Sequence, residues 1–243
     1  MIIKNFLNKI YISKYTYFII LLFLLCGLFK DIIIISILII IHEFGHYLVS
    51  YYFKWNIDKI NIYPFGGLIK YNEVIDKPLF EEFLISISGI IFQICIYIIL
   101  IIFIKDDKFL NLLNNYNYNI LLFNIIPIIP LDGSKVINVL LNKVFNFRIS
   151  YYLLLFISII FNIFLLINYK NLLINSFLLY ELFIYIKNKD YIFNKFLLEK
   201  YLYNDYHKYI YINSIKKLKR NKRHLIKYKN NYISIKNYIK KDM

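Results

Sequence analysis

The chain is poor in several residue types, and each shortage excludes a class of protein. Its 243 residues include two Cys, six Gly and four Pro. Two cysteines exclude a disulfide scaffold and a Cys-rich zinc module, and the scarcity of Gly and Pro excludes collagen-like and Pro-rich disordered chains. Acidic residues are also few, since 15 Asp+Glu stand against 30 Lys+Arg. Hydrophobic residues make up 60% of the chain, more than the roughly 45–50% of soluble domains, which predicts a membrane protein.

Long apolar runs carry most of the sequence. A transmembrane helix needs about 20 mostly apolar residues, with shorter runs possible where a helix breaks. Six runs approach this length, and they occupy residues 15–28, 32–53, 82–104, 112–131, 150–168 and 172–186. We therefore expect an all-α polytopic membrane protein, with one six-span domain over residues 1–186. A short segment after the second span, residues 61–71, is β-prone and predicts a membrane-associated hairpin or loop.

The cations predict the orientation of these spans. With a cytoplasmic N-terminus, all but four of the 30 basic residues fall in cytoplasmic segments. The four exceptions are Lys30, Lys105, Lys108 and Lys170. Cytoplasmic loops carry an excess of Lys and Arg, so both termini are expected on that side. Residues 187–243 then form a basic cytoplasmic tail, which favours anionic lipid as its partner rather than nucleic acid.

Three polar residues interrupt the second span and predict a metal site. His42, Glu43 and His46 form His-Glu-x-x-His inside an apolar run, where ionisable groups are costly and are candidates for function. Residues i and i+4 of a helix lie on one face, so both imidazoles can bind one Zn²⁺. Glu43 is placed to take a proton from water at the metal. The alternative is a pair of histidines hydrogen-bonded to other helices.

A catalytic zinc keeps three protein ligands, so one more is needed. Asp132 is the best candidate, because it follows a helix broken by Pro127 and Pro130, and broken backbone at membrane depth lines a cavity or is buried in protein. In the proposed topology Asp132 and the histidines fall in the same leaflet. The alternative for Asp132-Gly133 is a simple turn after a helix.

These motifs resemble the site-2 protease family of intramembrane zinc metalloproteases. The likeness rests on His-Glu-x-x-His in a membrane helix and on Asn124-x-x-Pro-x-x-Pro-Leu-Asp-Gly. Two further segments are similar to the sporulation branch of that family: Pro64-Phe65-Gly66-Gly67 and Phe196-Leu197-Leu198-Glu199-Lys200-Tyr201. The resemblance implies that His42, His46 and Asp132 bind one Zn²⁺, that Glu43 moves protons, and that Asn124 contacts the substrate or the oxyanion. Asn124 could instead satisfy backbone freed by Pro127.

The resemblance also implies a substrate and partners. The substrate would be a membrane-associated precursor of a sporulation sigma factor, and the regulators would be small inhibitory membrane proteins in the mother-cell membrane around the forespore. The segment with Pro64, Phe65, Gly66 and Gly67 would hold the substrate extended, by pairing with a strand edge. The alternative is an ordinary loop at the membrane surface.

Some positions depart from the family pattern. Ser134 stands where a second Gly is frequent, and Gln93 stands where the third span often has Asn, which makes Gln93 a weak site candidate. The tail has the size of a single CBS motif and lacks its small residues, so no CBS domain is expected. These departures leave room for an inactive scaffold that binds partner membrane proteins. A metal transporter would need more intramembrane ligands, and a prenyl-protein protease takes a Glu as third ligand.

Overall fold

The computed structural model describes residues 2–63, 66–72, 75–169, 172–202, 209–228 and 231–242. Within them the chain forms ten α-helices, one short 3-10 helix and six strands. Contacts between residues divide it into two compact units. The first holds Met1–Glu73, Leu84–Ile126 and Leu131–Gly133, and the second holds Val74–Phe83, Pro127–Pro130 and Ser134–Met243.

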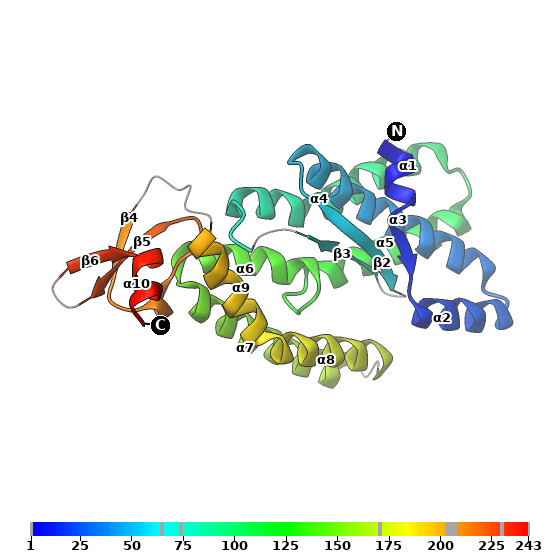
Figure 1. Ribbon diagram of the computed structural model, residues 1–243. Coiled ribbons are helices and arrows are strands. Elements are labelled where there is room, and N and C mark those ends of the chain that lie inside the picture. Colours follow the sequence, from blue (N-terminus) through cyan, green and yellow to red (C-terminus); the bar gives the residue numbers. More distant parts are fainter. Residues whose placement is uncertain are drawn as a thin grey trace. The chain divides into compact units, whose positions relative to one another are not determined.

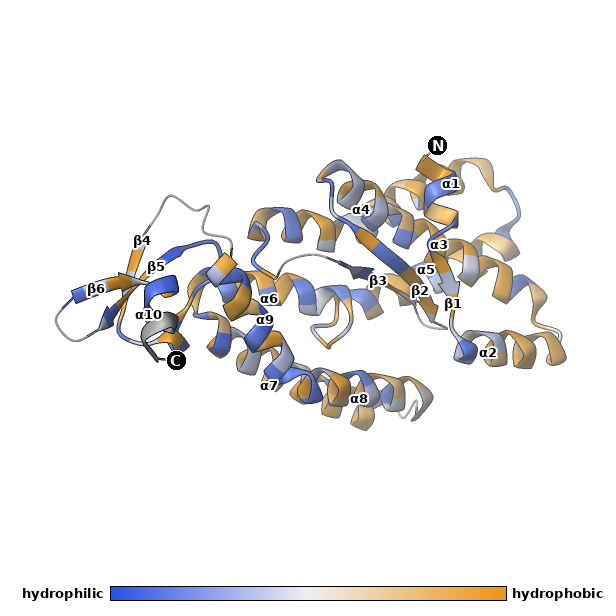
Figure 2. Ribbon diagram, in the orientation of Figure 1, coloured by the Kyte–Doolittle hydropathy of each residue, from blue (hydrophilic) through white to orange (hydrophobic). Residues whose placement is uncertain are grey.

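The first unit is built around one long apolar helix, α3 (Phe29–Tyr52). Its isoleucine side chains suit an apolar surrounding. A helix suits such a segment because, in lipid, it satisfies every backbone polar group internally. The helical part of this unit is completed by α1 (Ile2–Leu7), α2 (Lys14–Leu25), α5 (Asp107–Ile125) and α4 (Leu79–Phe103), whose first five residues belong to the second unit. Ile34, Leu38 and Leu113 are buried together where α3 meets α5. Figure 2 shows α2 and α3 as predominantly hydrophobic along their length.

A three-stranded sheet packs against α3 in the same unit (Figure 1). Its strands are β1 (Ile10–Ile12), β2 (Ile57–Tyr63) and β3 (Gly66–Tyr71), in the order β1-β2-β3. The antiparallel pair β2–β3 is the hairpin expected after the second span, while the parallel pairing of β1 with β2 was not expected. Ile57, Ile60 and Ile69 bury one face of the sheet against Phe6 and Tyr47.

The second unit contains the later helices and the tail. Its helices are α6 (Asp132–Val144), whose first two residues belong to the first unit, α7 (Phe147–Tyr169), α8 (Leu172–Lys187) and α9 (Lys189–Leu202). Within residues 187–243, expected as a basic tail, the described residues after α8 form α9, a second sheet and α10 (Ile235–Asp242). The sheet consists of β4 (Tyr209–Ile212), β5 (Arg223–Tyr228) and β6 (Asn231–Ser234), with 3-10 helix η1 (Ile215–Lys217) after β4.

This second sheet has its own core. Ile212 and Ile226 pack with Phe196 of α9 and Ile235 of α10. A buried ion pair, Lys200 Nζ to Asp76 Oδ2 at 2.5 Å, joins α9 to the segment before α4. Burial lowers the pKa of Lys200, and the opposite charge of Asp76 counters that shift. Two sheets therefore accompany the helices, and the expectation of an all-α chain was wrong in this respect. Strand β1 has three residues and pairs with β2, about 50 positions later in the chain, and the tail strands are also short.

Three of the described helices are long and apolar enough to cross a membrane: Phe29–Tyr52, Leu79–Phe103 and Phe147–Asn168. The other three expected spans correspond to α2, which is short, to α5, which is rich in Asn, and to α8. The chain is thus a membrane protein by its helices, and the count of six spans stays a prediction.

Candidate metal centre

Helix α3 brings His42 and His46 to one face, four residues apart. Both side chains are buried, each with 2% of its surface exposed. Their Nε2 atoms lie 3.1 Å apart. Helical spacing alone explains this pairing, since side chains one turn apart point in the same direction.

Asp132 completes a group of three. Helix α5 ends at Ile125, the chain passes Pro127 and Pro130, and α6 begins at Asp132 itself. One carboxylate oxygen, Oδ2, lies 2.8 Å from Nε2 of each histidine. A carboxylate in the first turn of a helix is favoured by the helix dipole. The structure therefore brings together the three residues predicted to bind the metal, although Asp132 is 90 residues after His42 and 86 residues after His46 in the chain.

The outer nitrogen of each ring is held by an acceptor. His46 Nδ1 donates to the backbone oxygen of Ile85 at 2.6 Å. His42 Nδ1 lies 2.9 Å from Oε1 of Gln93, and the Gln93 amide donates to Asn117 Oδ1 at 2.9 Å. A carbonyl cannot donate, so Nδ1 of His46 carries the hydrogen and Nε2 of the neutral ring presents a lone pair. The contact to Gln93 favours the same tautomer for His42.

This arrangement fits a metal ion. The two Nε2 atoms and the carboxylate oxygen lie within 3.1 Å of one another. Their lone pairs repel one another at this distance unless a cation binds between them. Two imidazole nitrogens and one carboxylate are a ligand set of catalytic zinc, which leaves a fourth position open. Among the described residues, His42, His46 and Asp132 form the group of three with this capacity.

Two glycines allow close approach to the site. A side-chain carbon at Gly89 of α4 would collide with Nε2 of His46, so only glycine lets α4 lie this close to the ligands. A carbon at Gly67 of β3 would collide with the side chain of Glu43. Glu43 is buried, with 2% exposed, and the hairpin therefore lies directly against its carboxyl group.

Asn124 is buried near the end of α5, and its amide donates to Ile120 O at 3.1 Å, one turn back in the same helix. This amide hydrogen bond goes to Ile120, although the sequence analysis also considered backbone freed by Pro127 as its partner. The carbonyl oxygen of Asn124 faces Gly66, at 3.9 Å from where a side-chain carbon would stand. Pro64 and Phe65 of the expected substrate loop lie outside the described residues, while Gly66 and Gly67 begin β3.

Sequence reasoning undervalued Gln93 and missed Asn117. Gln93 is fully buried in α4 and Asn117 is 4% exposed in α5. An amide within an apolar run is itself a signal of an intramembrane role. The pairing of these two amides depends on how α4 and α5 pack, which the sequence does not state.

Replacing Gln93 with Leu should weaken zinc binding by about 10- to 100-fold, the usual cost of losing the partner that orients a histidine ligand. The affinity is measured by competition with a chelator of known strength on the detergent-solubilised chain. Tyr97→Phe is the matched control, because it removes another hydrogen bond between α4 and α5, Tyr97 to Asn114, without touching a ligand. Equal zinc affinity in all three proteins would contradict the role of Gln93.

Comparison with known proteins agrees with this geometry. Residues 31–106 match the family model "Peptidase family M50". Stage IV sporulation protein FB of Bacillus subtilis is 32% identical over 157 residues, which cover 63% of this chain and 54% of that protein. A zinc metalloprotease of Methanocaldococcus jannaschii is 28% identical over 122 residues, covering 47% of this chain and 35% of that protein. The chain thus spans about half the length, or less, of these relatives.

A solved structure shows the same fold. The site-2 protease from Methanocaldococcus jannaschii superposes with a TM-score of 0.58 at 20% identity, over 71% of this chain and 88% of that one. The match to residues 31–106 includes the helix with His42, Glu43 and His46. Over residues 31–106 the chain is therefore similar to peptidase family M50, and it shares the fold of a site-2 protease.

Proposed function

We propose that this protein is an intramembrane zinc metalloprotease that hydrolyses a peptide bond of a membrane-associated protein near the cytoplasmic leaflet. The observation that carries the proposal is the convergence of His42, His46 and Asp132 beside Glu43, all buried in an apolar helical unit. One Zn²⁺ per chain suits this ligand set. When bound, zinc lowers the pKa of water and polarises a carbonyl oxygen.

The protein groups then have defined tasks. Glu43 accepts a proton from the attacking water as its oxygen bonds to the carbonyl carbon of the substrate. The same carboxyl group returns that proton to the nitrogen as the carbon–nitrogen bond breaks, which leaves a carboxylic acid and an amine. Gly67 packs against Glu43 and limits its movement. Gln93 and Ile85 O keep both imidazoles in the tautomer that binds metal.

The substrate must be unwound, because the peptide groups of a helix already bond one another. Strand β3 is at the edge of its sheet, and it begins with Gly66 and Gly67 beside Glu43. An extended substrate that paired with this edge would present its backbone to the carboxyl group. Asn124, whose carbonyl oxygen faces Gly66, is suited to hydrogen-bond such a chain.

The likeness to a stage IV sporulation protein supports a role in sporulation. On this basis the substrate is a membrane-associated sigma-factor precursor, and small membrane proteins inhibit the enzyme. The distribution of cations supports cytoplasmic termini, with the protein as a multi-pass component of the bacterial membrane, at the mother-cell side around the forespore. The basic tail binds anionic lipid through its Lys and Arg residues.

An inactive scaffold is less well supported. One of the three sequence arguments for it, beside Ser134 and the lack of a CBS domain, is the altered third span, where Gln93 stands in place of Asn. Yet Gln93 is fully buried, and its Oε1 lies 2.9 Å from Nδ1 of His42. The altered residue can therefore still orient the His42 ring. A scaffold would gain nothing from buried groups that converge on a cation, since each is costly in a membrane.

Removal of zinc tests the proposal. The purified protein in lipid nanodiscs should cleave a membrane-associated sigma-factor precursor, lose at least about nine-tenths of that activity after a zinc chelator, and regain it when one equivalent of zinc is added. A calcium-selective chelator is the control and should have no effect. Cleavage that continues in metal-free protein would contradict the proposal, and so would a zinc-loaded protein that cleaves no precursor.

A further inference from the structure

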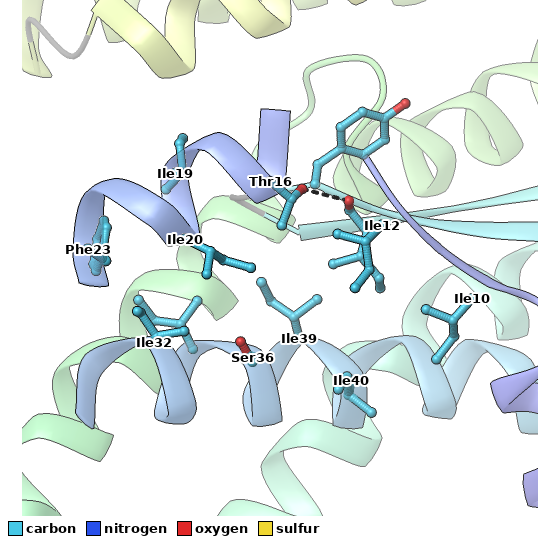
Figure 3. A pocket seen from close by; sticks show the side chains of 13 residues that line it. Ile10, Ile12, Thr16, Ile19, Ile20, Phe23, Ile32, Ser36, Ile39 and Ile40 are labelled. Carbon is cyan, nitrogen blue, oxygen red and sulfur yellow. Dashed lines mark hydrogen bonds between the residues drawn. The ribbon is translucent and has the colours of Figure 1, made fainter. Parts of the chain in front are cut away.

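An apolar cavity of about 240 Å³ lies in the first unit, between α2, α3 and the strands β1 and β2. Most of its lining is isoleucine, and its polar members are Thr16, Ser36 and Tyr63. Figure 3 shows Ile20 of α2 and Ile39 of α3 pointing toward each other across it. An apolar cavity of about 150 Å³ already binds benzene, so this one has room for a large aliphatic or aromatic group.

The cavity follows one stripe of α3 toward Glu43. Its lining includes Ile32, Ser36, Ile39 and Ile40, which recur at helical spacing. Glu43 is four residues after Ile39 and three after Ile40, so it extends the same face by one turn. One turn of helix is about 5.4 Å long. A group bound against Ile39 and Ile40 therefore lies one turn from the proposed proton carrier.

The sheet leads to the same place. Ile62 and Tyr63, at the end of β2, line the cavity. The hairpin then returns as β3 with Gly66 and Gly67, and Gly67 packs against Glu43. Helix α3 and the β2–β3 sheet, which both line the cavity, thus both extend from it to the carboxyl group of Glu43. This continuity distinguishes the cavity from a gap that lipid alone would fill.

Hydrogen bonds keep the cavity in shape. Thr16, the buried residue of α2, donates to the backbone oxygen of Ile62 at 2.8 Å, as drawn in Figure 3, and Ser13 N donates to the same oxygen at 3.0 Å. These two bonds hold the start of α2 against the end of β2. At that end of the cavity, the apolar faces of α2 and α3 therefore remain separated. The hydroxyl of Thr16 is thus hydrogen-bonded, and most of the cavity lining offers apolar contact.

We infer that this cavity receives an apolar side chain of the substrate, close to the bond that is cut. The inference rests on the proposed function and adds the substrate class: a chain with a large aliphatic or aromatic residue within about three positions of the cleavage site. Ser36 is seven residues before Glu43 in the same helix, which is about 10 Å at 1.5 Å per residue. An extended substrate spans that distance in about three residues.

Disulfide cross-linking tests the inference. Ser36→Cys is made in the Glu43→Gln chain, with the two native cysteines, Cys26 and Cys95, replaced by Ala. The probe is the sigma-factor precursor that the wild type cleaves, with single cysteines stepped through six positions on each side of the cut. Ile37→Cys is the matched control, since Ile37 is the neighbouring residue and is 47% exposed on another face.

Cross-links from position 36 should peak two to four residues from the cut and exceed those from position 37 by about tenfold. In the cleavage-competent chain, Ser36→Leu should lower kcat/KM about tenfold for a precursor with Phe at the peak position and less than threefold for one with Ala. Equal cross-linking from both positions, or none from position 36, would overturn the inference and assign the cavity to lipid. Since wild-type cleavage is measured first, this failure is separate from failure of the proposed function.

Discussion

Glu43→Gln should leave zinc bound and lower the turnover of a membrane-associated precursor by about 10²- to 10⁴-fold. This is the range expected when a group that transfers protons is removed. Glutamine has nearly the shape of glutamate, so the packing against Gly67 is kept. An amide does not accept a proton from water at neutral pH, and it has none to return to the leaving nitrogen.

Two measurements on the same preparation separate chemistry from folding. Zinc per chain reports whether His42, His46 and Asp132 still converge, and the initial rate of precursor cleavage reports the chemical step. Asp58→Asn is the control, because it makes the same change of a carboxylate to an amide at an exposed position of β2. If Glu43→Gln cleaved at the rate of Asp58→Asn, the proton-transfer role of Glu43 would be wrong.

The histidine pair and its helix follow from local rules. His42 and His46 are four residues apart, and helical geometry then fixes their shared face wherever the helix packs. Asp132 required a longer argument, from the break at Pro127 and Pro130 and from the shared leaflet. The structure brings its carboxylate within 2.8 Å of both rings, as this argument predicted. These parts could be predicted because spacing, polarity and depth are properties of the sequence itself.

Contacts between distant side chains could not be predicted in this way. Gln93 meets Asn117 because α4 and α5 pack in one particular register, and many registers are compatible with two apolar helices. The glycines gave a weaker signal, since close approach explains Gly89 only when its neighbour, His46, is known. Sequence reasoning therefore identified the candidate metal ligands more completely than the residues that contact them.

The strands show the same limit. Strand β1 has three residues, Ile10–Ile12, and pairs in parallel with β2 about 50 positions later in the chain. In the tail, Ile210 and Ile212 alternate with the exposed Tyr209 and Tyr211, a period of two that is typical of a strand. The overall content of Lys, Asn and Tyr concealed this pattern. For this reason the sequence predicted only a basic tail. The tail is basic, and it also folds into a sheet.

Asp132→Ala should abolish stable zinc binding, with bound metal falling from about one ion per chain to less than about 0.2. Asp132 supplies the negative charge of the ligand set, and its Oδ2 is the atom that approaches both Nε2 nitrogens. Without it, two neutral imidazoles must hold a dication in an apolar surrounding. Loss of a partner that only orients a ligand costs 10- to 100-fold in affinity, and loss of a charged ligand should cost more.

Metal content is measured by mass spectrometry on protein purified in mild detergent and dialysed against zinc at low concentration. Asp107→Ala, an exposed acidic residue at the start of α5, should bind as much zinc as the wild type. Elution of all three proteins at the same volume in gel filtration shows that each is folded. A folded Asp132→Ala that kept about one zinc per chain would exclude Asp132 as a ligand. The third ligand would then have to be another residue. Glu43 would be tested first, because it is adjacent to His42. If Glu43 bound the metal, it could not also transfer protons.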